Sequence, residues 1–475
     1  MHVAFRRCFT MAAFALATAA IIGPARPADA QVTPETLIGK SVSDISDAIS
    51  KPIDEAITLF KNRQFDDARN KLKATCQANP QLPPAGVIMA QMFVAANQGL
   101  AARGELERCV LNTPNDPEPY LVFGDLAFQN RQVTESGLCF DKANQLCASY
   151  DANPRRKRDL QIRAFAGQAA VAAAREQHTM EEQLLGKWIE LEPDSTAAYT
   201  RLGRCQFKQG GSDNEKRAYA TFGKLYDEID TEKDPAKKVP RPEINMAVLY
   251  TQDKRPKNAE QLMKLALQRA AADDINSRLA VSQWALENGD LTLAKSAAAA
   301  AYKVDPDSLQ GMLLLGVAAR YEGDLVKAEQ WFRAALGKAP SNFAAINNLS
   351  LTLIEKPDET ARKQALEFAQ LNQRVNTQLN TAAGREAAAT LAWAFFRMGR
   401  EADAEKGMIQ ILQSGSVSNE AAFHAAKVLV DRGRSQQARQ ILEPLVKQTN
   451  FFPGKSEAKT MLDKLAAEGD LLPSP

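Results

Sequence analysis

Apolar residues recur at intervals of three and four along most of the chain, in segments separated by short polar or proline-containing turns. The clearest segments run from Leu309 to Tyr321, from Leu325 to Leu336 and from Phe343 to Ile354. This spacing places the apolar side chains on one face of a helix. The turns contain Gly323 and Pro340, and Pro cannot continue a helix. The pattern therefore predicts an all-α chain built from pairs of short antiparallel helices.

The helix pairs between Ile275 and Asn342 repeat about every 34 residues, which is the length of a common helical repeat. Four pairs of identical residues lie one period apart: Gly289 and Gly323, Ala294 and Ala328, Ala301 and Ala335, and Pro306 and Pro340. Small residues let the two helices of a pair approach closely. A single pair cannot bury both of its apolar faces, so the period predicts an array of stacked pairs.

The best block resembles the tetratricopeptide repeat at six places with the expected spacings: Leu315-Gly316, Gly323, Ala328, Phe332, Ala335 and Pro340. The resemblance covers most of the chain after residue 30, with varying quality. It implies a right-handed α-solenoid of antiparallel helix pairs, with about eleven repeats and a lone C-terminal capping helix from Ser456 to Glu468. It also implies a concave face that binds a protein or peptide segment and is lined by the first helix of each pair.

On the three best repeats, the resemblance places a set of side chains on this concave face. The candidate peptide-binding groove consists of Leu279, Gln283, Leu286, Leu313, Val317, Tyr321, Asn347, Leu351 and Ile354. The set is apolar with scattered amides, and it lacks the Lys/Asn/Arg clamp by which some family members hold a C-terminal carboxylate. The alternative is that these side chains pack internally or against an adjacent turn of the superhelix, because extended apolar patches rarely stay exposed.

The array is expected to be divided once. We expect an N-terminal array at residues 31–230, a linker or hinge at 231–242, and a C-terminal array with the capping helix at 243–475. The linker is charged and contains Pro, which favours a break between helices. A basic run, Arg155 to Arg158, also interrupts the pattern and is predicted to be a solvated loop.

The first thirty residues have the order of a cleavable export signal. Arg6 and Arg7 precede an apolar stretch from Met11 to Ile22, and Ala28-Asp29-Ala30 provides a small-x-small cleavage pattern. The apolar stretch is too short to anchor the chain across a bilayer. An uncleaved interfacial helix and export by a twin-arginine route are the alternatives. We therefore expect a periplasmic or secreted protein whose signal is cleaved after Ala30, so that it begins at Gln31.

Cleavage would also balance the charge of the chain. The signal carries three Arg and one Asp, so its removal leaves 56 basic and 56 acidic residues of the original 59 and 57. A net charge of zero argues against nucleic acid or an anionic membrane as the main partner. No other apolar run is long enough to span a membrane. We expect a protein or peptide partner and no small-molecule substrate.

Candidate catalytic chemistry is sparse. The sequence contains no phosphate-binding loop, nucleophile elbow or zinc-protease motif. Only three His are present, and we interpret His178 as a solvated loop residue and His424 as a helix residue that is packed or on the surface. The Cys after residue 30 form no CxxC pair and are interpreted as mostly free, buried thiols: Cys76, Cys109, Cys139, Cys147 and Cys205. We expect no catalytic residue, no cofactor and no metal.

The sequence therefore predicts a non-catalytic scaffold of the cell envelope in a bacterium, which holds a protein or peptide segment in its concave face. An accessory subunit of an export or polysaccharide-assembly machine is an alternative that rests on analogy of fold. An enzyme is a third class, which the missing catalytic constellation disfavours.

Overall fold

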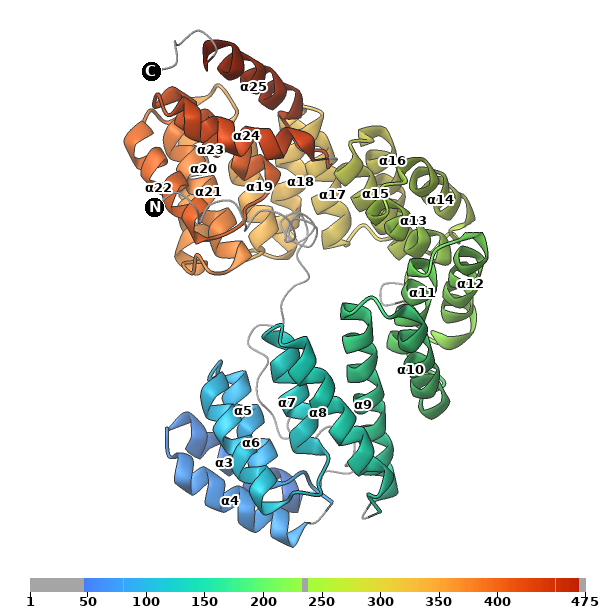
Figure 1. The fold of residues 1–475 in the computed structure, drawn as a ribbon. Helices are drawn as coiled ribbons and strands as arrows, with labels where there is room; N and C mark the ends of the chain where they lie inside the picture. The colour runs from blue at the N-terminus through green and yellow to red at the C-terminus, as the bar shows by residue number, and fades with distance from the viewer. Residues whose placement is uncertain (1–46, 80, 152, 233–237, 449, 470–475) are drawn as a thin grey trace. The chain divides into compact units, whose positions relative to one another are not determined.

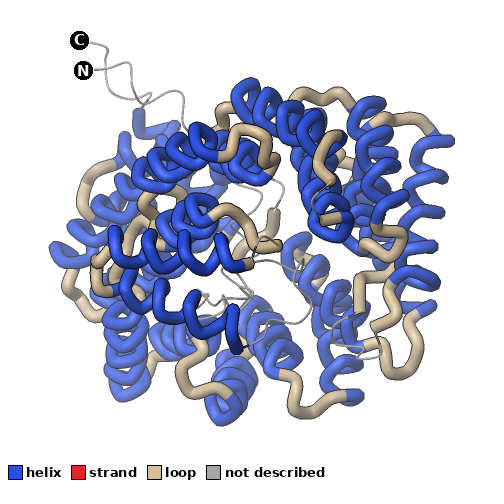
Figure 2. Tube along the Cα trace, turned by 90° about the horizontal axis from the view of Figure 1, so that it is seen from below, coloured by secondary structure: helices blue, strands red, loops and turns tan. Residues whose placement is uncertain are grey.

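The computed structural model describes residues 47–79, 81–151, 153–232, 238–448 and 450–469. Within these ranges the chain consists of α-helices and one short π-helical segment, and it contains no strand (Figure 1, Figure 2). The predicted all-α class is therefore confirmed. The expected export signal at residues 1–30, and part of the expected linker at 231–242, lie outside the described residues.

The described residues divide into two compact units. The N-terminal unit holds residues 47–232 and 241–259. Its helices are α3 (Asp47–Lys61), α4 (Phe65–Ala78), α5 (Ala85–Ala95), α6 (Gly99–Asn112), α7 (Glu118–Gln129), α8 (Val133–Ala148), α9 (Pro154–Ala174), α10 (His178–Leu191), α11 (Thr196–Lys208), α12 (Ser212–Lys224), the π-helical η2 (Leu225–Ile229) and α13 (Pro242–Gln252).

The C-terminal unit holds residues 238–240 and 260–469. Its helices are α15 (Ile275–Asn288), α16 (Leu291–Val304), α17 (Leu309–Tyr321), α18 (Leu325–Lys338), α19 (Phe343–Ile354), α20 (Glu359–Val375), α21 (Ala382–Arg397), α22 (Glu401–Ser414), α23 (Asn419–Asp431), α24 (Ser435–Lys447) and α25 (Lys455–Gly469). Helix α14 (Pro256–Arg269) spans the boundary between the units. The division into arrays at 31–230 and 243–475 stays a prediction.

The helices follow one another as hairpins, so the chain is an α-solenoid. Among the described helices, ten consecutive pairs pack as hairpins, from α3–α4 to α11–α12 and from α15–α16 to α23–α24. Helix α25 packs alone on α24, where the capping helix was predicted. In the C-terminal unit the first helices of successive pairs, α15, α17, α19, α21 and α23, also contact one another. They form the inner layer of the array, and it is this layer that carries the candidate site.

The turn inside each pair explains the period of the repeats. In the best repeat, Gly323 adopts a left-handed conformation with φ +82°, and Asp324 then caps α18 by accepting a hydrogen bond from the Lys327 N–H. The same left-handed turn recurs once per period in the N-terminal unit at Arg63, Asn97 and Arg131, with φ of 61°, 57° and 61°. The period therefore persists in the backbone where the sequence lacks the glycine that marks it.

Glycine is required where the two helices of a pair touch. A Cβ added at Gly316 would lie 2.5 Å from the ring of Phe332, which is fully buried. The same contact joins Gly124 to Phe140, with the same spacing along the chain. Each ring fills the space that the missing side chain leaves, so these glycines set the distance between the helices.

Replacing Gly316 by Leu is therefore expected to overpack the α17–α18 pair and to lower the free energy of unfolding by about 1–3 kcal/mol. The matched control is Gly337→Leu in α18, because Gly337 is exposed and no atom would lie within 4 Å of its added Cβ. That change is expected to stabilise the helix by about 0.5–1 kcal/mol. Urea unfolding of both variants measures the difference, and equal effects would contradict the proposed packing.

The basic run at Arg155 to Arg158 is not a solvated loop, as the sequence predicted, but the first turn of α9. Arg156 is 3% exposed, and its guanidinium donates to Asp116 and Glu118, each at 2.9 Å. These carboxylates raise the pKa of Arg156 further above its ordinary value, although burial opposes them. The prediction was wrong because both partners belong to an earlier helix pair, beyond the reach of a local pattern.

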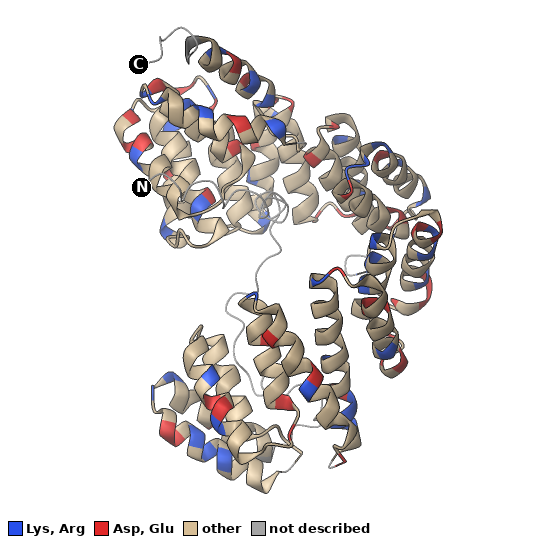
Figure 3. Cartoon of the chain, viewed as in Figure 1, with Lys and Arg blue, Asp and Glu red and all other residues tan. Residues whose placement is uncertain are grey.

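Charged side chains of both signs are interspersed along the described helices of both units (Figure 3). No described helix has the combination of length and apolar character that crossing a membrane requires. The five Cys after residue 30 are free thiols in the structure, and burial raises the pKa of Cys76 and Cys147 to about 12. Such thiols are largely protonated at neutral pH, which makes them poor nucleophiles.

Candidate functional site

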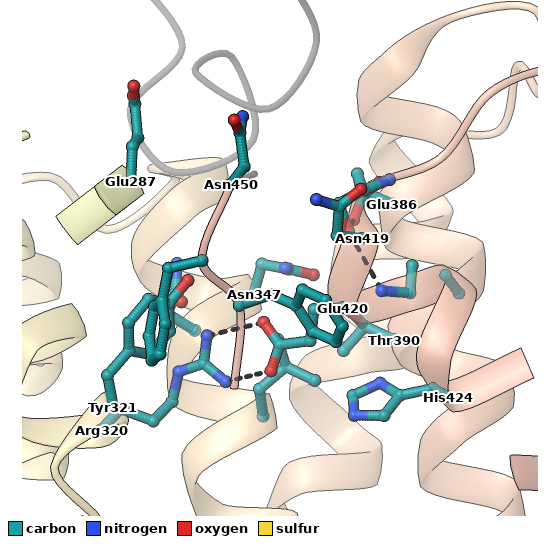
Figure 4. A pocket seen from close by; sticks show the side chains of 17 residues that line it. Glu287, Arg320, Tyr321, Asn347, Glu386, Thr390, Asn419, Glu420, His424 and Asn450 are labelled. Atoms are coloured by element: carbon teal, nitrogen blue, oxygen red, sulfur yellow. Dashed lines mark hydrogen bonds and ion pairs between the residues drawn. The ribbon is translucent and has the colours of Figure 1, made fainter. Parts of the chain in front are cut away.

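The inner layer of the C-terminal unit contains a partly open pocket (Figure 4). Side chains from α15, α17, α19, α21 and α23 line it, together with the segment 450–452 that connects α24 to α25. Its cavity volume is about 60 Å³. One water needs roughly 10–15 Å³ of such space, so the pocket has room for a few waters or for the end of a side chain.

An ion pair between Arg320 and Glu420 forms the floor of the pocket. The two guanidinium Nη atoms donate to the two carboxylate oxygens at 2.5 and 2.9 Å. The pair joins the end of α17 to the start of α23, three helix pairs further along the chain, and the side chains are only 9% and 15% exposed. Although burial opposes both changes, the pairing raises the pKa of Arg320 and lowers that of Glu420. Both groups are therefore charged at neutral pH.

Two further carboxyl groups line the pocket without a basic partner at hydrogen-bonding distance. Glu386 accepts hydrogen bonds from the Ser418 N–H and hydroxyl at 2.7 and 2.9 Å, at the start of α23. Glu287 accepts from the Gln283 amide at 2.6 Å. Burial raises the pKa of both Glu386 and Glu287 above the ordinary value, because the ionised form has lost water.

The segment between α24 and α25 closes one side of the pocket. The Phe451 N–H donates to the Glu287 carbonyl oxygen at 2.8 Å, and the Phe451 ring lies 5.7 Å from that of Tyr321. The Phe451 ring also covers Gly289, where an added Cβ would lie 2.8 Å from it. The last helix pair is thus tied to α15, and the pocket depends on both ends of this unit.

His424 lies at the edge of the pocket and stacks on Trp393, with ring centroids 4.0 Å apart and planes 2° from parallel. Burial lowers the pKa of His424 to about 4, although Glu420 nearby acts in the opposite direction. The imidazole is therefore neutral at neutral pH and packs as an aromatic ring. Of the two alternatives that the sequence left open for His424, packed or on the surface, the structure shows the packed one.

Asn347 supplies an unsatisfied acceptor. Asn347 lines the pocket and is 5% exposed. Its amide oxygen Oδ1 has no hydrogen-bond partner. A buried carbonyl oxygen without a donor costs about 1–3 kcal/mol. A ligand that donates an N–H or O–H group into the pocket would remove this cost.

A group of possible metal ligands lies elsewhere, in the N-terminal unit. Ligand atoms of His178, Glu181 and Cys205 lie within 4.8 Å of one another. His178 is the first residue of α10 rather than a loop residue, and its Nδ1 lies 3.3 Å from the Glu181 carboxylate. The three types suit Zn²⁺ with a fourth position open. However, the Cys205 thiol donates to the His178 carbonyl oxygen, and burial raises its pKa to about 12, so its protonated form is favoured.

Residues 283–343 match the family model of the tetratricopeptide repeat. The chain contains tetratricopeptide repeats in this stretch. The matched residues include the end of α15 and all of α16, α17 and α18, and with them Glu287, Arg320 and Tyr321 of the pocket lining. No curated protein is significantly similar to the chain in sequence.

Solved structures of other repeat proteins are similar to this tetratricopeptide-repeat chain at low identity. A tetratricopeptide-repeat protein of Thermus thermophilus is 16% identical, with a TM-score of 0.34, over 41% of this chain and 99% of its own. Yeast Tom70 is 12% identical, with a TM-score of 0.39, over 89% and 96%. A tetratricopeptide-repeat protein of Parabacteroides merdae is 12% identical, with a TM-score of 0.34, over 64% and 99%.

The repeats bring together three of the nine residues predicted for the groove: Tyr321, Asn347 and Leu351 line the pocket. Five other members have exposures of 6% or less and lie in the apolar core: Leu279, Leu286, Leu313, Val317 and Ile354. Gln283 is partly exposed and bonded to Glu287. Whether any of them binds a partner stays a prediction.

Sequence reasoning missed the polar members of the pocket. Glu386 and Glu420 lie on α21 and α23, in repeats that match the family pattern less well than the matched stretch. The available signal was their repeat position, because Glu386 and Glu420 lie one period apart in the sequence. Matching positions on the first helices of successive repeats face the same side of the array, which predicts that both carboxyl groups point inward.

Proposed function

We propose that this tetratricopeptide-repeat protein is a non-catalytic scaffold that binds a protein segment at the pocket in its C-terminal unit. The observation that carries the proposal is the partly open pocket itself, which the inner helices of five successive repeats line. The unsatisfied oxygen of Asn347 supports the proposal, because it could accept a hydrogen bond from a bound partner.

The side chains of the pocket favour binding over catalysis. His424 would be the natural general base, but a pKa of about 4 makes it a weak base at neutral pH. Arg320 and Glu420 neutralise each other. What remains is a set of polar hydrogen-bonding groups and aromatic rings, which suits recognition of a partner side chain.

We further propose that the protein acts after export, in the periplasm or outside the cell. The support is the order of charge, apolar stretch and cleavage pattern in residues 1–30. A role as accessory subunit of an export or polysaccharide-assembly machine is a narrower form of the same proposal. Capture of a stable set of machine components from envelope fractions would favour this form over a scaffold with several loosely held partners.

A photo-crosslinking amino acid placed at Asn419, which lines the pocket, is expected to capture the partner. The same group at Val326, which is 62% exposed on the second helix of a pair, is the control and is expected not to. With the captured partner, Tyr321→Ala is expected to weaken binding by about 1–3 kcal/mol, as titration of the purified proteins measures. Val326→Ala is expected to leave the affinity unchanged.

Thermal melts of both variants separate binding from folding, because Tyr321 also packs on Phe451. A Tyr321→Ala protein that melts early but binds normally while folded would show that Tyr321 is only a packing residue. The partner surface would then have to lie outside the pocket.

A further inference from the structure

The charges of the pocket lining do not cancel. Three carboxyl groups line it, those of Glu287, Glu386 and Glu420, against the single guanidinium of Arg320. Arg320 is already engaged by both oxygens of Glu420. The lining therefore offers an anionic ligand no available cation. It offers a cationic ligand two carboxyl groups, those of Glu287 and Glu386, that have no ion-pair partner in the lining.

The lining also carries hydrogen-bond acceptors with spare capacity. Glu386 and Glu287 are bonded to Ser418 and Gln283, which leaves further lone pairs on each carboxylate. Asn347, at 5% exposure, presents an oxygen with no donor. The lining therefore offers acceptors to a ligand that brings several N–H donors.

The walls of the pocket suit a cation as well. The rings of Tyr321, Phe451 and His424 line it. A cation already lies against one of them, since the Arg320 guanidinium carbon is 5.1 Å from the centre of the Tyr321 ring. Aromatic faces attract ammonium and guanidinium groups through the ring quadrupole, and this attraction is larger where water is excluded.

From the uncompensated carboxyl groups, the free Asn347 oxygen and the small volume, we infer that the pocket binds the cationic end of a Lys or Arg side chain from the partner segment. This inference rests on the proposed function and specifies its ligand. A cation that reached Glu287 or Glu386 would replace water that the carboxylate has lost, a loss that the raised pKa of each group reflects.

The test selects peptides from a random display library on the purified full-length chain and measures their affinity by fluorescence anisotropy. Selected peptides are expected to share a Lys or Arg. Replacing it by norleucine or citrulline keeps the length of the side chain and removes the charge, and is expected to weaken binding about tenfold or more. Acetylation of the peptide N-terminus is expected to have no effect. If acetylation alone abolished binding, the pocket would hold a terminal amine and the inference would fail.

Protein variants assign the effect to the pocket. Glu287→Gln is expected to weaken binding of the cationic peptide about tenfold and to leave the norleucine peptide unchanged. Glu322→Gln removes the same charge from an exposed position outside the pocket lining and is the matched control. Glu386→Gln is a second test of the same kind, with a melt to check the Ser418 contact. Equal losses for Glu287→Gln and Glu322→Gln would indicate long-range attraction only and would overturn the inference.

Two kinds of failure can be told apart. If no selected peptide loses affinity for Tyr321→Ala, the pocket is not the docking site and the proposed function fails. If peptides lose affinity for Tyr321→Ala but tolerate norleucine or citrulline, the pocket binds a segment, and only the assignment of a cationic side chain is wrong.

Discussion

Replacing Arg320 by Met is expected to destabilise the C-terminal unit by about 3–5 kcal/mol. The side chains of Arg320 and Glu420 are 9% and 15% exposed, and they are joined by two hydrogen bonds. Loss of the guanidinium leaves the Glu420 carboxylate buried beside Glu386, without an ion-pair partner. Most of the cost comes from this stranded charge rather than from the loss of attraction.

The double variant Arg320→Met with Glu420→Met separates these contributions. Because this double variant leaves no buried charge without a partner, it is expected to regain most of the stability that Arg320→Met loses. Arg439→Met in the exposed pair with Glu443 is the control and is expected to cost at most about 1 kcal/mol. In a Trp188→Phe background the remaining Trp, Trp284, Trp331 and Trp393, all lie in the C-terminal unit, so urea unfolding followed by fluorescence reports on this unit. A double variant as unstable as the single one would contradict this account.

Acidification from pH 7 to pH 4 is expected to cost the wild-type chain roughly 3 kcal/mol of stability relative to a His424→Phe variant. The pKa of His424 in the folded protein is about 4, below the ordinary value of 6.5. Between these values the unfolded chain binds a proton that the folded chain rejects, so stability falls as the pH falls. The contribution is complete above about pH 6.5 and is lost as the pH reaches 4.

The comparison with Phe isolates this one group. Phe keeps an aromatic ring against Trp393 and cannot titrate. The charged groups near the ring are Glu420, which favours protonation, and Arg320, Lys427 and Arg397, which oppose it. These groups are unchanged in the variant, so their own titration largely cancels in the difference. A difference in unfolding free energy that stays constant from pH 7 to pH 4 would show that His424 is not held neutral.

Much of the local structure could be predicted from the sequence. Helices α17 and α19 begin and end at the residues that the apolar pattern predicted, and the capping helix was placed within one residue at each end. These features depend on turns, prolines and spacings within one repeat, which a local pattern contains. The close approach of Gly316 to Phe332 was predictable for the same reason.

The pocket was only partly predictable, because it depends on how the repeats curve. The expectation that the first helix of each pair lines the inner face identified Tyr321, Asn347 and Leu351, because it depends only on where each repeat begins in the sequence. It could not pair Arg320 with Glu420, because the curvature that brings them together accumulates over several repeats from small rotations. The burial of Arg156 was missed for a similar reason, since its acidic partners belong to a preceding repeat.

The closure of the C-terminal unit by Phe451 has a consequence for the order of events during synthesis. Repeat arrays can fold progressively as each pair docks on the one before it. The contacts of Phe451 with Glu287 and Tyr321, however, cannot form until the chain has been made beyond α24. Before that point, α15 and α17 can already be paired with α16 and α18, while this side of the pocket is still open. A partner segment that met the nascent chain at that stage could enter from the side and be enclosed when the last hairpin closes.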